Sequence, residues 1–296
     1  MKQEDEVILA PGAGIALKSG DRSIGAILIE AGRLKGEDVE SILRLQREQG
    51  LRFGDAAMQL GLITLADIEL ALSRQFDYPY LLRGQSAVSE EVVAAYAPFS
   101  PQVEAMRALR GQLMLRWFDT DVDHKALAII SGARKEGRSF IAANLAVVFS
   151  QLGEHTLLID ADLRNPRQHQ LFSLDNRAGL SAVLSGRGGR DAIQRVPSLP
   201  DLSVLPAGAL PPNPSELLGR PFFSQMLHDL AKEFDVILLD TPAAAENTDA
   251  QTATTRAGSA LVVVRKNASR VWQVRGIADN AVQTDVTIVG TVFNDF

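Results

Sequence analysis

Short apolar runs alternate with longer amphipathic stretches over the C-terminal two thirds of the chain. The runs are residues 126–130, 156–159, 202–205, 236–239, 260–264 and 287–292. They are continuously apolar, which is typical of parallel strands covered on both faces. With helices between them, they predict an α/β fold with a doubly wound, mostly parallel sheet. Ligands of such sheets bind beyond the carboxyl ends of the strands.

A repeat of 29 residues precedes this pattern. Three polar or glycine positions and five apolar positions recur with that spacing: Gly25/Gly54, Gly32/Gly61, Gln46/Gln75, Ile24/Phe53, Ile29/Met58, Leu34/Ile63, Val39/Ile68 and Leu43/Leu72. Each copy is long enough for two short helices with a turn at Gly32 or Gly61. Thr64 and Asp67 are typical of a helix N-cap and a first-turn acid. We therefore expect a small, mainly helical domain over residues 17–83.

A stretch rich in glycine, serine and proline follows the repeat. It predicts a linker over residues 84–102, with one short helix in it, before an α/β domain over residues 103–296. The helical stretch at 103–118 carries Glu104, Arg107 and Arg110, which lie three residues apart and so share one face. This face is either solvated or forms an interface with another subunit.

Composition narrows the functional classes. The chain has 296 residues, a net charge of −6 and a pI of about 5.3, which disfavours general nucleic-acid binding. Zero cysteines exclude disulfides and thiolate chemistry. Apolar runs stay short of the roughly 20 residues of a membrane span, and residues 1–16 do not resemble a signal peptide. We expect a cytoplasmic protein without direct membrane insertion, peripheral to the inner membrane through a partner.

Residues 131–139, Ser-Gly-Ala-Arg-Lys-Glu-Gly-Arg-Ser, lie between the first strand and a helix. They match the phosphate-loop pattern G-x-x-x-x-G-K-[ST] except that Arg138 stands at the lysine position. Backbone N–H groups and the helix dipole converge there on an anion. Ser139 is placed to ligate Mg²⁺, and Gly137 lets the backbone approach phosphate. The candidate nucleotide-binding residues are Gly132, Lys135, Glu136, Gly137, Arg138, Ser139 and Phe140.

Two acidic motifs follow later strands. Asp160 and Asp162 end the second apolar run, and Asp240 ends the fourth, within Leu-Asp-Thr-Pro. Carboxylates at strand ends can bind a hard cation or accept a proton from an attacking hydroxyl. A lone D-x-D pair is more often a pair of surface acids. Three motifs in this order, each at a strand end, instead predict a phosphate-loop NTPase.

These motifs, with Pro-Pro-Asn-Pro-Ser-Glu-Leu-Leu at 211–218, resemble the cytoplasmic domain of bacterial tyrosine kinases of capsular and exopolysaccharide export. The resemblance covers roughly residues 104–296, and within the family it is to the chain-length-determinant tyrosine kinases of EpsG type. It implies ATP and Mg²⁺ as cofactors, Arg138, Asp160 and Asp162 as catalytic residues, and Ser139, Asp160 and Asp240 as metal ligands. It also implies a homo-oligomer with Glu104, Arg107 and Arg110 at its interface. The implied partner is a membrane-embedded polysaccharide co-polymerase or chain-length determinant.

The repeat resembles the N-terminal domain of type II secretion ATPases, which has a version that binds cyclic di-GMP through two tandem units. Arg52-Phe53-Gly54 through Gln75 matches well; in the first copy Ser23 takes the arginine position, beside Arg22. The resemblance implies a cyclic di-GMP site of Arg22, Gly25, Gln46, Arg52, Gly54 and Gln75. The alternative is a helical docking domain whose glycines serve packing.

Three hypotheses for the activity follow. The first is an ATP- and Mg²⁺-dependent tyrosine kinase-like ATPase that regulates exopolysaccharide polymerisation, chain length and export. The second is a non-catalytic nucleotide switch or scaffold, because Arg138 replaces the expected lysine. The third, a partition-type ATPase, is disfavoured because its characteristic lysine would fall at Ala133. The only tyrosines are Tyr78, Tyr80 and Tyr96, so we expect no autophosphorylation of a C-terminal tyrosine cluster. The substrate is then another protein or one of these three.

Overall fold

The computed structural model describes residues 23–75, 79–119 and 125–295. They divide into two compact units, one before Pro79 and one from Pro79 onward. The boundary therefore lies a few residues before the predicted end of the helical domain at 83.

The N-terminal unit contains four described helices. They are α1 (Ile24–Glu30), α2 (Asp38–Gln49), α3 (Phe53–Gln59) and α4 (Leu65–Gln75). Gly32 and Gly61 follow α1 and α3 at equivalent positions with the same φ of +67°, a conformation that favours glycine. Before α4, Thr64 and Asp67 form a capping box: the Thr64 amide donates to the Asp67 carboxylate at 2.9 Å, and the Asp67 amide donates to the Thr64 hydroxyl at 3.3 Å.

The core of this unit reproduces the sequence repeat. The eight buried apolar residues of this core cluster are four pairs spaced by 29 positions: Ile27/Ala56, Leu28/Ala57, Leu34/Ile63 and Ile42/Ala71. The two copies exchange partners, because α1 packs against α4 and α2 packs against α3. Of the expected apolar pairs, Leu34/Ile63 lies in the core, whereas Ile29 and Leu43 are exposed. Neither copy could bury its apolar face alone.

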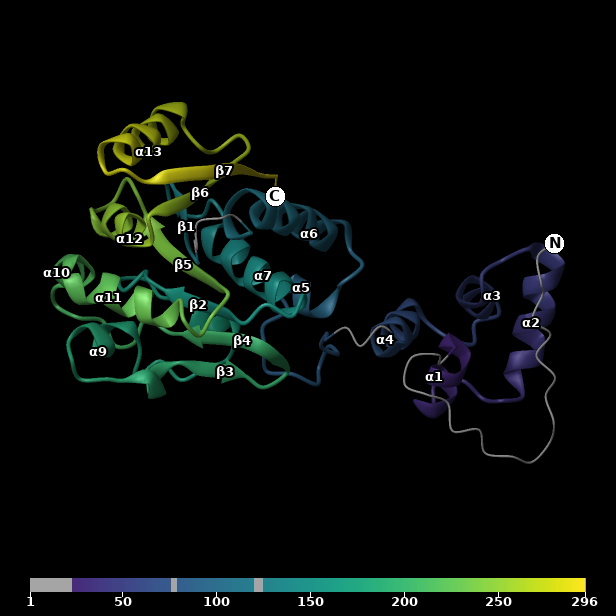
Figure 1. Ribbon diagram of the computed structural model, residues 1–296. Coiled ribbons are helices and arrows are strands. Elements are labelled where there is room, and N and C mark those ends of the chain that lie inside the picture. Colours follow the sequence, from purple (N-terminus) through teal and green to yellow (C-terminus); the bar gives the residue numbers. More distant parts are fainter. Residues whose placement is uncertain (1–22, 76–78, 120–124, 296) are drawn as a thin grey trace. The chain divides into compact units, whose positions relative to one another are not determined.

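The C-terminal unit is built on a seven-stranded sheet in the order β3-β4-β2-β5-β1-β6-β7 (Figure 1). The strands are β1 (Ala126–Ser131), β2 (Thr156–Asp160), β3 (Gln194–Val196), β4 (Leu199–Leu205), β5 (Val236–Ala243), β6 (Ser259–Arg265) and β7 (Thr287–Asn294). All pairs are parallel except β3 with β4. The predicted doubly wound fold is confirmed. The sequence missed β3, a three-residue edge strand with two polar residues.

Helices cover both faces of this sheet (Figure 1). One face packs against α5 (Val93–Tyr96), α6 (Pro101–Leu113) with its continuation η1 (Met114–Phe118), α7 (Arg138–Ser150) and α8 (Gln168–Leu171). The other packs against α9 (Leu180–Leu184), η2 (Arg190–Ala192), α10 (Pro214–Gly219), α11 (Pro221–Leu230), α12 (Asp249–Ala257) and α13 (Val271–Gln283). The central helix α7 is buried along almost its whole length, which explains why it lacks a polar face.

The predicted linker at 84–102 is packed against the C-terminal unit. Val88, Val92 and Tyr96 lie in the core that surrounds α7. The Asn144 side chain of α7 accepts a hydrogen bond from the Ala94 amide at 2.8 Å and donates to the Glu91 carbonyl at 3.2 Å. The glycine, serine and proline content predicted a linker that does not pack against either unit. The apolar residues between them instead hold this segment against α7 by burying apolar surface.

Candidate nucleotide-binding site

The phosphate-loop motif lies at the carboxyl end of β1, directly before the N-terminus of α7. Gly137 precedes the helix with a φ of +98°, and Lys135 has a φ of +61°. At Gly132 an added Cβ would lie 2.8 Å from Gln273 Cβ, so the loop fits against α13 only with glycine there. The loop therefore has the tight backbone that directs N–H groups towards an anion.

Side chains from three other segments hold the loop. The buried Glu136 carboxylate, 2 % exposed, accepts from the Ala133 amide at 2.8 Å and from the Ser269 hydroxyl. Asn294 donates to the Glu136 carbonyl at 3.0 Å, and Arg265 donates to the Lys135 carbonyl at 3.0 Å. Glu136 is a predicted nucleotide contact, but its side chain and its carbonyl are both used to hold the loop.

Arg138, the residue at the lysine position, is 8 % exposed and folded beneath the loop. Its guanidinium donates to the Thr241 carbonyl at 2.8 Å, to the Ser131 hydroxyl at 2.5 Å and to the Ala133 carbonyl at 2.8 Å. It therefore ties both ends of the loop to β5. The planar fork of an arginine makes these three bonds at once, which the single ammonium of a lysine would do less rigidly.

Asp160 and Asp240 are brought together by the sheet. Strands β2 and β5 are neighbours, and their parallel register pairs these two residues. Both side chains are fully buried. Burial and the charge of Asp240 raise the pKa of Asp160 well above its ordinary value. Burial also raises the pKa of Asp240, against the opposing influence of the Arg138 guanidinium and of the Gln168 and Ser139 side chains.

Gln168, the first residue of α8, contacts both carboxylates. Its backbone amide donates to Asp160 Oδ2 at 2.9 Å, as does the Arg167 amide at 2.9 Å. Its side-chain Nε2 donates to Asp240 Oδ2 at 2.7 Å and to the Ser139 carbonyl at 3.1 Å. All three sequence motifs therefore meet at this one residue. No sequence pattern points to Gln168, because a lone glutamine after a D-x-D motif carries no signal of its own.

Asp162, 8 % exposed, is joined to this pair by its backbone amide, which donates to Asp160 Oδ1 at 3.3 Å. Its Oδ1 accepts from the Asn165 amide at 2.9 Å, and its side chain lines a cavity of about 190 Å³ above the loop. The other residues lining it are Arg134, Lys135, Gly137, Arg138, Ser139, Phe140, Asn165, Arg167, Ala243 and Glu246. Most of the candidate nucleotide-binding residues thus share one cavity. Of the two D-x-D carboxylates, only Asp162 reaches it.

A metal ion at this site would depend on the nucleotide for part of its coordination. Among the described residues, no three His, Asp or Glu side chains lie close enough to form a metal site. The buried Oδ1 of Asp240, however, has no hydrogen-bond partner in the described part of the chain. Mg²⁺ binds through one or two carboxylates together with substrate phosphates and water. Asp240, together with Ser139 and the phosphates bound by the loop, would meet that requirement. The Asp160 carboxylate is less suited to bind a metal, because it already accepts hydrogen bonds from backbone amides.

A second network, centred on the buried Asp249, joins the D-x-D segment to the Pro-Pro-Asn-Pro-Ser-Glu segment. The Asp249 carboxylate, 1 % exposed, pairs with Arg164 at 2.7 Å and accepts from the Ser215 hydroxyl. Asp249 begins α12, Ser215 lies in α10, and Arg164 follows Asp162 by two residues. The Pro-Pro-Asn-Pro-Ser-Glu segment is therefore tied to the D-x-D segment through Asp249. Sequence alone had offered no role for Asp249.

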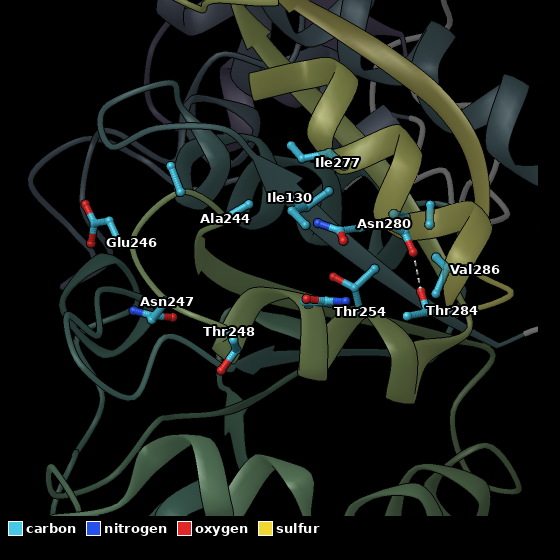
Figure 2. A pocket seen from close by; sticks show the side chains of 14 residues that line it. Ile130, Ala244, Glu246, Asn247, Thr248, Thr254, Ile277, Asn280, Thr284 and Val286 are labelled. Carbon is cyan, nitrogen blue, oxygen red and sulfur yellow. Dashed lines mark hydrogen bonds between the residues drawn. The ribbon is translucent and has the colours of Figure 1, made fainter. Parts of the chain in front are cut away.

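A further cavity of about 250 Å³ lies between α12 and α13. Figure 2 shows Thr254 of α12 and Asn280 of α13 lining it, with Glu246, Asn247 and Thr248 from the segment after β5. It contains none of the three motif carboxylates and shares only Glu246 with the loop cavity. We therefore assign the phosphate chemistry to the smaller cavity.

The three charged residues of α6 have different surroundings. Glu104 is exposed and forms an ion pair with the less exposed Arg107 at 3.2 Å. Arg110 donates to the Val148 carbonyl of α7 at 2.6 Å. Arg110 therefore makes a contact within its own subunit. Of the predicted interface residues, Glu104 and Arg107 pair with each other on α6.

The fold and the site together define a phosphate-loop nucleotide-binding protein of the doubly wound α/β type. Comparisons refine this class. The family described as cellulose biosynthesis protein BcsQ matches residues 125–282. The tyrosine-protein kinase YwqD of Bacillus subtilis is 31% identical over 71% of this chain and 87% of its own length. The kinase domain of the Escherichia coli tyrosine kinase ETK superposes with a TM-score of 0.67 at 31% identity, covering 74% of this chain and 86% of that domain.

The chain belongs to the bacterial tyrosine-protein kinase family, and the resemblance predicted from its motifs is confirmed. Some relatives are much longer. The putative tyrosine-protein kinase EpsB of Ralstonia nicotianae is 31% identical over 78% of this chain, but the matched part is 30% of EpsB.

Proposed function

We propose that this protein binds ATP and Mg²⁺ at the loop of residues 131–139 and transfers the γ-phosphoryl group to a tyrosine of a partner protein. The observation that carries the proposal is the convergence of the loop, the D-x-D motif and Asp240 at Gln168. Ser139 and Asp240 would hold the metal, and loop amides would bind the phosphates. Bound Mg²⁺ would neutralise the charge that develops on the phosphoryl group.

Asp162 is our candidate for the general base. It lines the loop cavity, whereas Asp160 is enclosed and already accepts from three backbone amides. Asp162 would take the proton of the tyrosine hydroxyl as its oxygen attacks the γ-phosphorus and ADP leaves. Asp160 instead orients the segment that presents Asp162 and Gln168. This division of roles differs from the one that the resemblance implied, in which Asp160 was both a catalytic residue and a metal ligand.

The acceptor tyrosine belongs to another molecule in this proposal. Tyr96 is buried in the core and donates its hydroxyl proton to the Val88 carbonyl, so phosphorylation there would require local unfolding. Tyr80 is half-buried, and Tyr78 lies outside the described residues. We further propose that the partner is the membrane-embedded co-polymerase of exopolysaccharide export. No described helix is both long and apolar enough to span a bilayer.

The test is phosphate transfer from labelled ATP to a tyrosine-containing polymer, with nucleotide affinity measured in parallel. Wild-type protein should label the polymer, and Asp162→Asn should lower the rate by roughly 10²–10⁴-fold while retaining ADP binding. Asp279→Asn, an exposed acid on α13, is the matched control and should leave the rate unchanged. Absence of any nucleotide binding would contradict the proposal.

A non-catalytic switch is the second candidate, and the internal hydrogen bonds of Arg138 favour it. A guanidinium that serves Thr241, Ser131 and Ala133 is less available to a γ-phosphate. ATP binding by the wild type without transfer, together with transfer by Arg138→Lys, would support this candidate. Transfer by the wild type that is unchanged in Arg138→Lys would contradict it.

Control by cyclic di-GMP remains a prediction for the N-terminal unit. Arg52 is exposed and Gln46 and Gln75 are half-buried, so these side chains are accessible to a ligand, while Arg22 lies outside the described residues. Gly25 and Gly54, however, are in contact with apolar side chains: added Cβ atoms would lie 3.0 Å from the Phe53 ring and 2.8 Å from Ile68. The structure therefore supports a packing role for the two glycines. Calorimetry of the full chain with cyclic di-GMP tests the hypothesis, and absence of heat at tens of micromolar would exclude it.

A further inference from the structure

Gln168 occupies a position where a glutamine is costly. Its side chain is fully buried at the start of a four-residue helix, between β2, β5 and α7. Burying an amide group is unfavourable unless each polar atom is hydrogen-bonded, and an apolar side chain of similar size would fill the same volume without that cost. The residue therefore needs an explanation beyond packing.

The orientation of the amide is fixed by its partners. Nε2 lies 2.7 Å from Asp240 Oδ2 and 3.1 Å from the Ser139 carbonyl, and both of these atoms are acceptors. Rotating the amide by 180° would place Oε1 against the same two acceptors, so Nε2 must be the atom that faces them. Oε1 is then the amide atom that makes neither contact.

Two buried acceptors are left without partners in this contact. Within the described part of the chain, neither Gln168 Oε1 nor Asp240 Oδ1 receives a hydrogen bond. They belong to the two groups that the 2.7 Å hydrogen bond joins. Buried acceptors without partners mark places where a water molecule or ion completes the structure. Here the Gln168 amide also contacts the backbone of Ser139, the loop residue expected to ligate the metal.

We propose that Gln168 is a positioning residue of the magnesium site. Its Nε2 holds Asp240 by Oδ2 and so leaves Oδ1 to face the metal, while its Oε1 accepts a hydrogen bond from a water molecule of the metal's hydration shell. Magnesium retains several waters in protein sites, and groups that orient a ligating carboxylate commonly contribute 10- to 100-fold to metal affinity. The inference rests on the proposed nucleotide-binding function and adds a residue that none of the sequence motifs contains.

The bond from the Gln168 backbone to Asp160 gives this position a second role. Because the Gln168 and Arg167 amides both donate to Asp160 Oδ2, the carboxylate fixes the start of α8 relative to β2. The Gln168 side chain is thereby aligned with Asp240 on the neighbouring strand. Replacing the side chain leaves these backbone bonds intact, so the variants below alter the amide group alone.

The test is the Mg²⁺ affinity of the ADP complex of the full chain. Magnesium chloride is titrated by calorimetry into metal-free protein with saturating ADP, and ADP affinity is measured separately in EDTA. Gln168→Met keeps the side-chain length and removes the amide; Gln168→Asn keeps the amide and withdraws it by one methylene, which provides a milder second variant. Gln170→Met, at an exposed glutamine of the same helix, is the matched control.

We expect Mg²⁺ affinity to fall about 10-fold or more in Gln168→Met and Gln168→Asn, with ADP affinity in EDTA and the control unchanged. Unchanged Mg²⁺ affinity in both variants would overturn the inference while leaving the proposed function intact. Equal losses of ADP affinity with and without Mg²⁺ would also overturn it, because they would indicate a packing role. If the wild-type chain bound no ADP, the proposed function would fail and the inference with it.

Discussion

Asp160 and Asp240 illustrate at the residue scale how function opposes stability. Two carboxylates are buried on neighbouring strands, and burial raises the pKa of each. An aspartate whose folded-state pKa is raised binds its proton more tightly in the native protein than in the unfolded chain. Protonation therefore favours folding below the folded-state pKa, and this stabilisation is lost as pH rises through that value.

Asp240→Asn should consequently stabilise the protein without metal or nucleotide. At neutral pH the substitution removes one buried charge, and the asparagine carbonyl oxygen can still accept the hydrogen bond from Gln168 Nε2. We expect the free energy of unfolding to rise by about 1 kcal/mol at pH 7 and the gain to shrink as pH falls towards the ordinary range of an aspartate. Chemical denaturation in EDTA at several pH values measures this, with Asp279→Asn as control. A loss of stability at pH 7 would contradict the prediction.

At the scale of elements, the repeat shows how glycines permit two helical pairs to pack. Gly25 of α1 lies against the Phe53 ring, and the equivalent Gly54 of α3 lies against Ile68. Sequence offered two explanations for these glycines, close packing or approach to a ligand. The contacts made in the folded unit favour the first.

Gly25→Val and Gly54→Val should each destabilise the N-terminal unit by about 1–3 kcal/mol, since even a Cβ atom would approach its neighbour within 3.0 Å or less. Gly36→Val is the control, because nothing lies within 4 Å of an added Cβ there. Hydrogen exchange of the α1–α4 amides in the full chain measures the effect, and protection in the C-terminal unit should not change. Equal protection in all three variants would argue against a packing role.

At the scale of the whole molecule, the family model matches residues 125–282. That the chain forms a homo-oligomer through α6 is a prediction. Glu104 and Arg107 form an ion pair on the outer side of α6, while Arg110 is engaged with α7. If this helix face forms a homo-oligomer, Arg107→Glu should shift the full chain towards monomers. The substitution reverses the charge at position 107 and places a second carboxylate beside Glu104 on that face. Sedimentation equilibrium measures the shift, with Arg44→Glu in the N-terminal unit as control. An unchanged mass distribution would exclude Arg107 from the interface.

The sequence by itself determined the order of the elements and the positions of the motifs. Continuous apolar runs predicted six of the seven strands, and the phosphate loop and the D-x-D motif lie at strand ends as expected. Leu-Asp-Thr-Pro instead lies within β5, which continues past Asp240 to Ala243. These features are local: they depend on side-chain periodicity and on backbone conformations that a few adjacent residues dictate. The 29-residue repeat is likewise recognisable from the sequence alone.

Only the tertiary structure decided which side chains meet. The register of β2 with β5 pairs Asp160 with Asp240, and α8 then places Gln168 on both. Long-range contacts also bind the Arg138 side chain to β5 beneath the loop. They bury Asp160, whereas Asp162 lines the cavity. The predicted linker packs against α7 for the same reason. Such contacts join positions tens of residues apart, and no local pattern records them. The phosphate loop could be read from the sequence, but the contacts beneath it arise only when the strands are assembled.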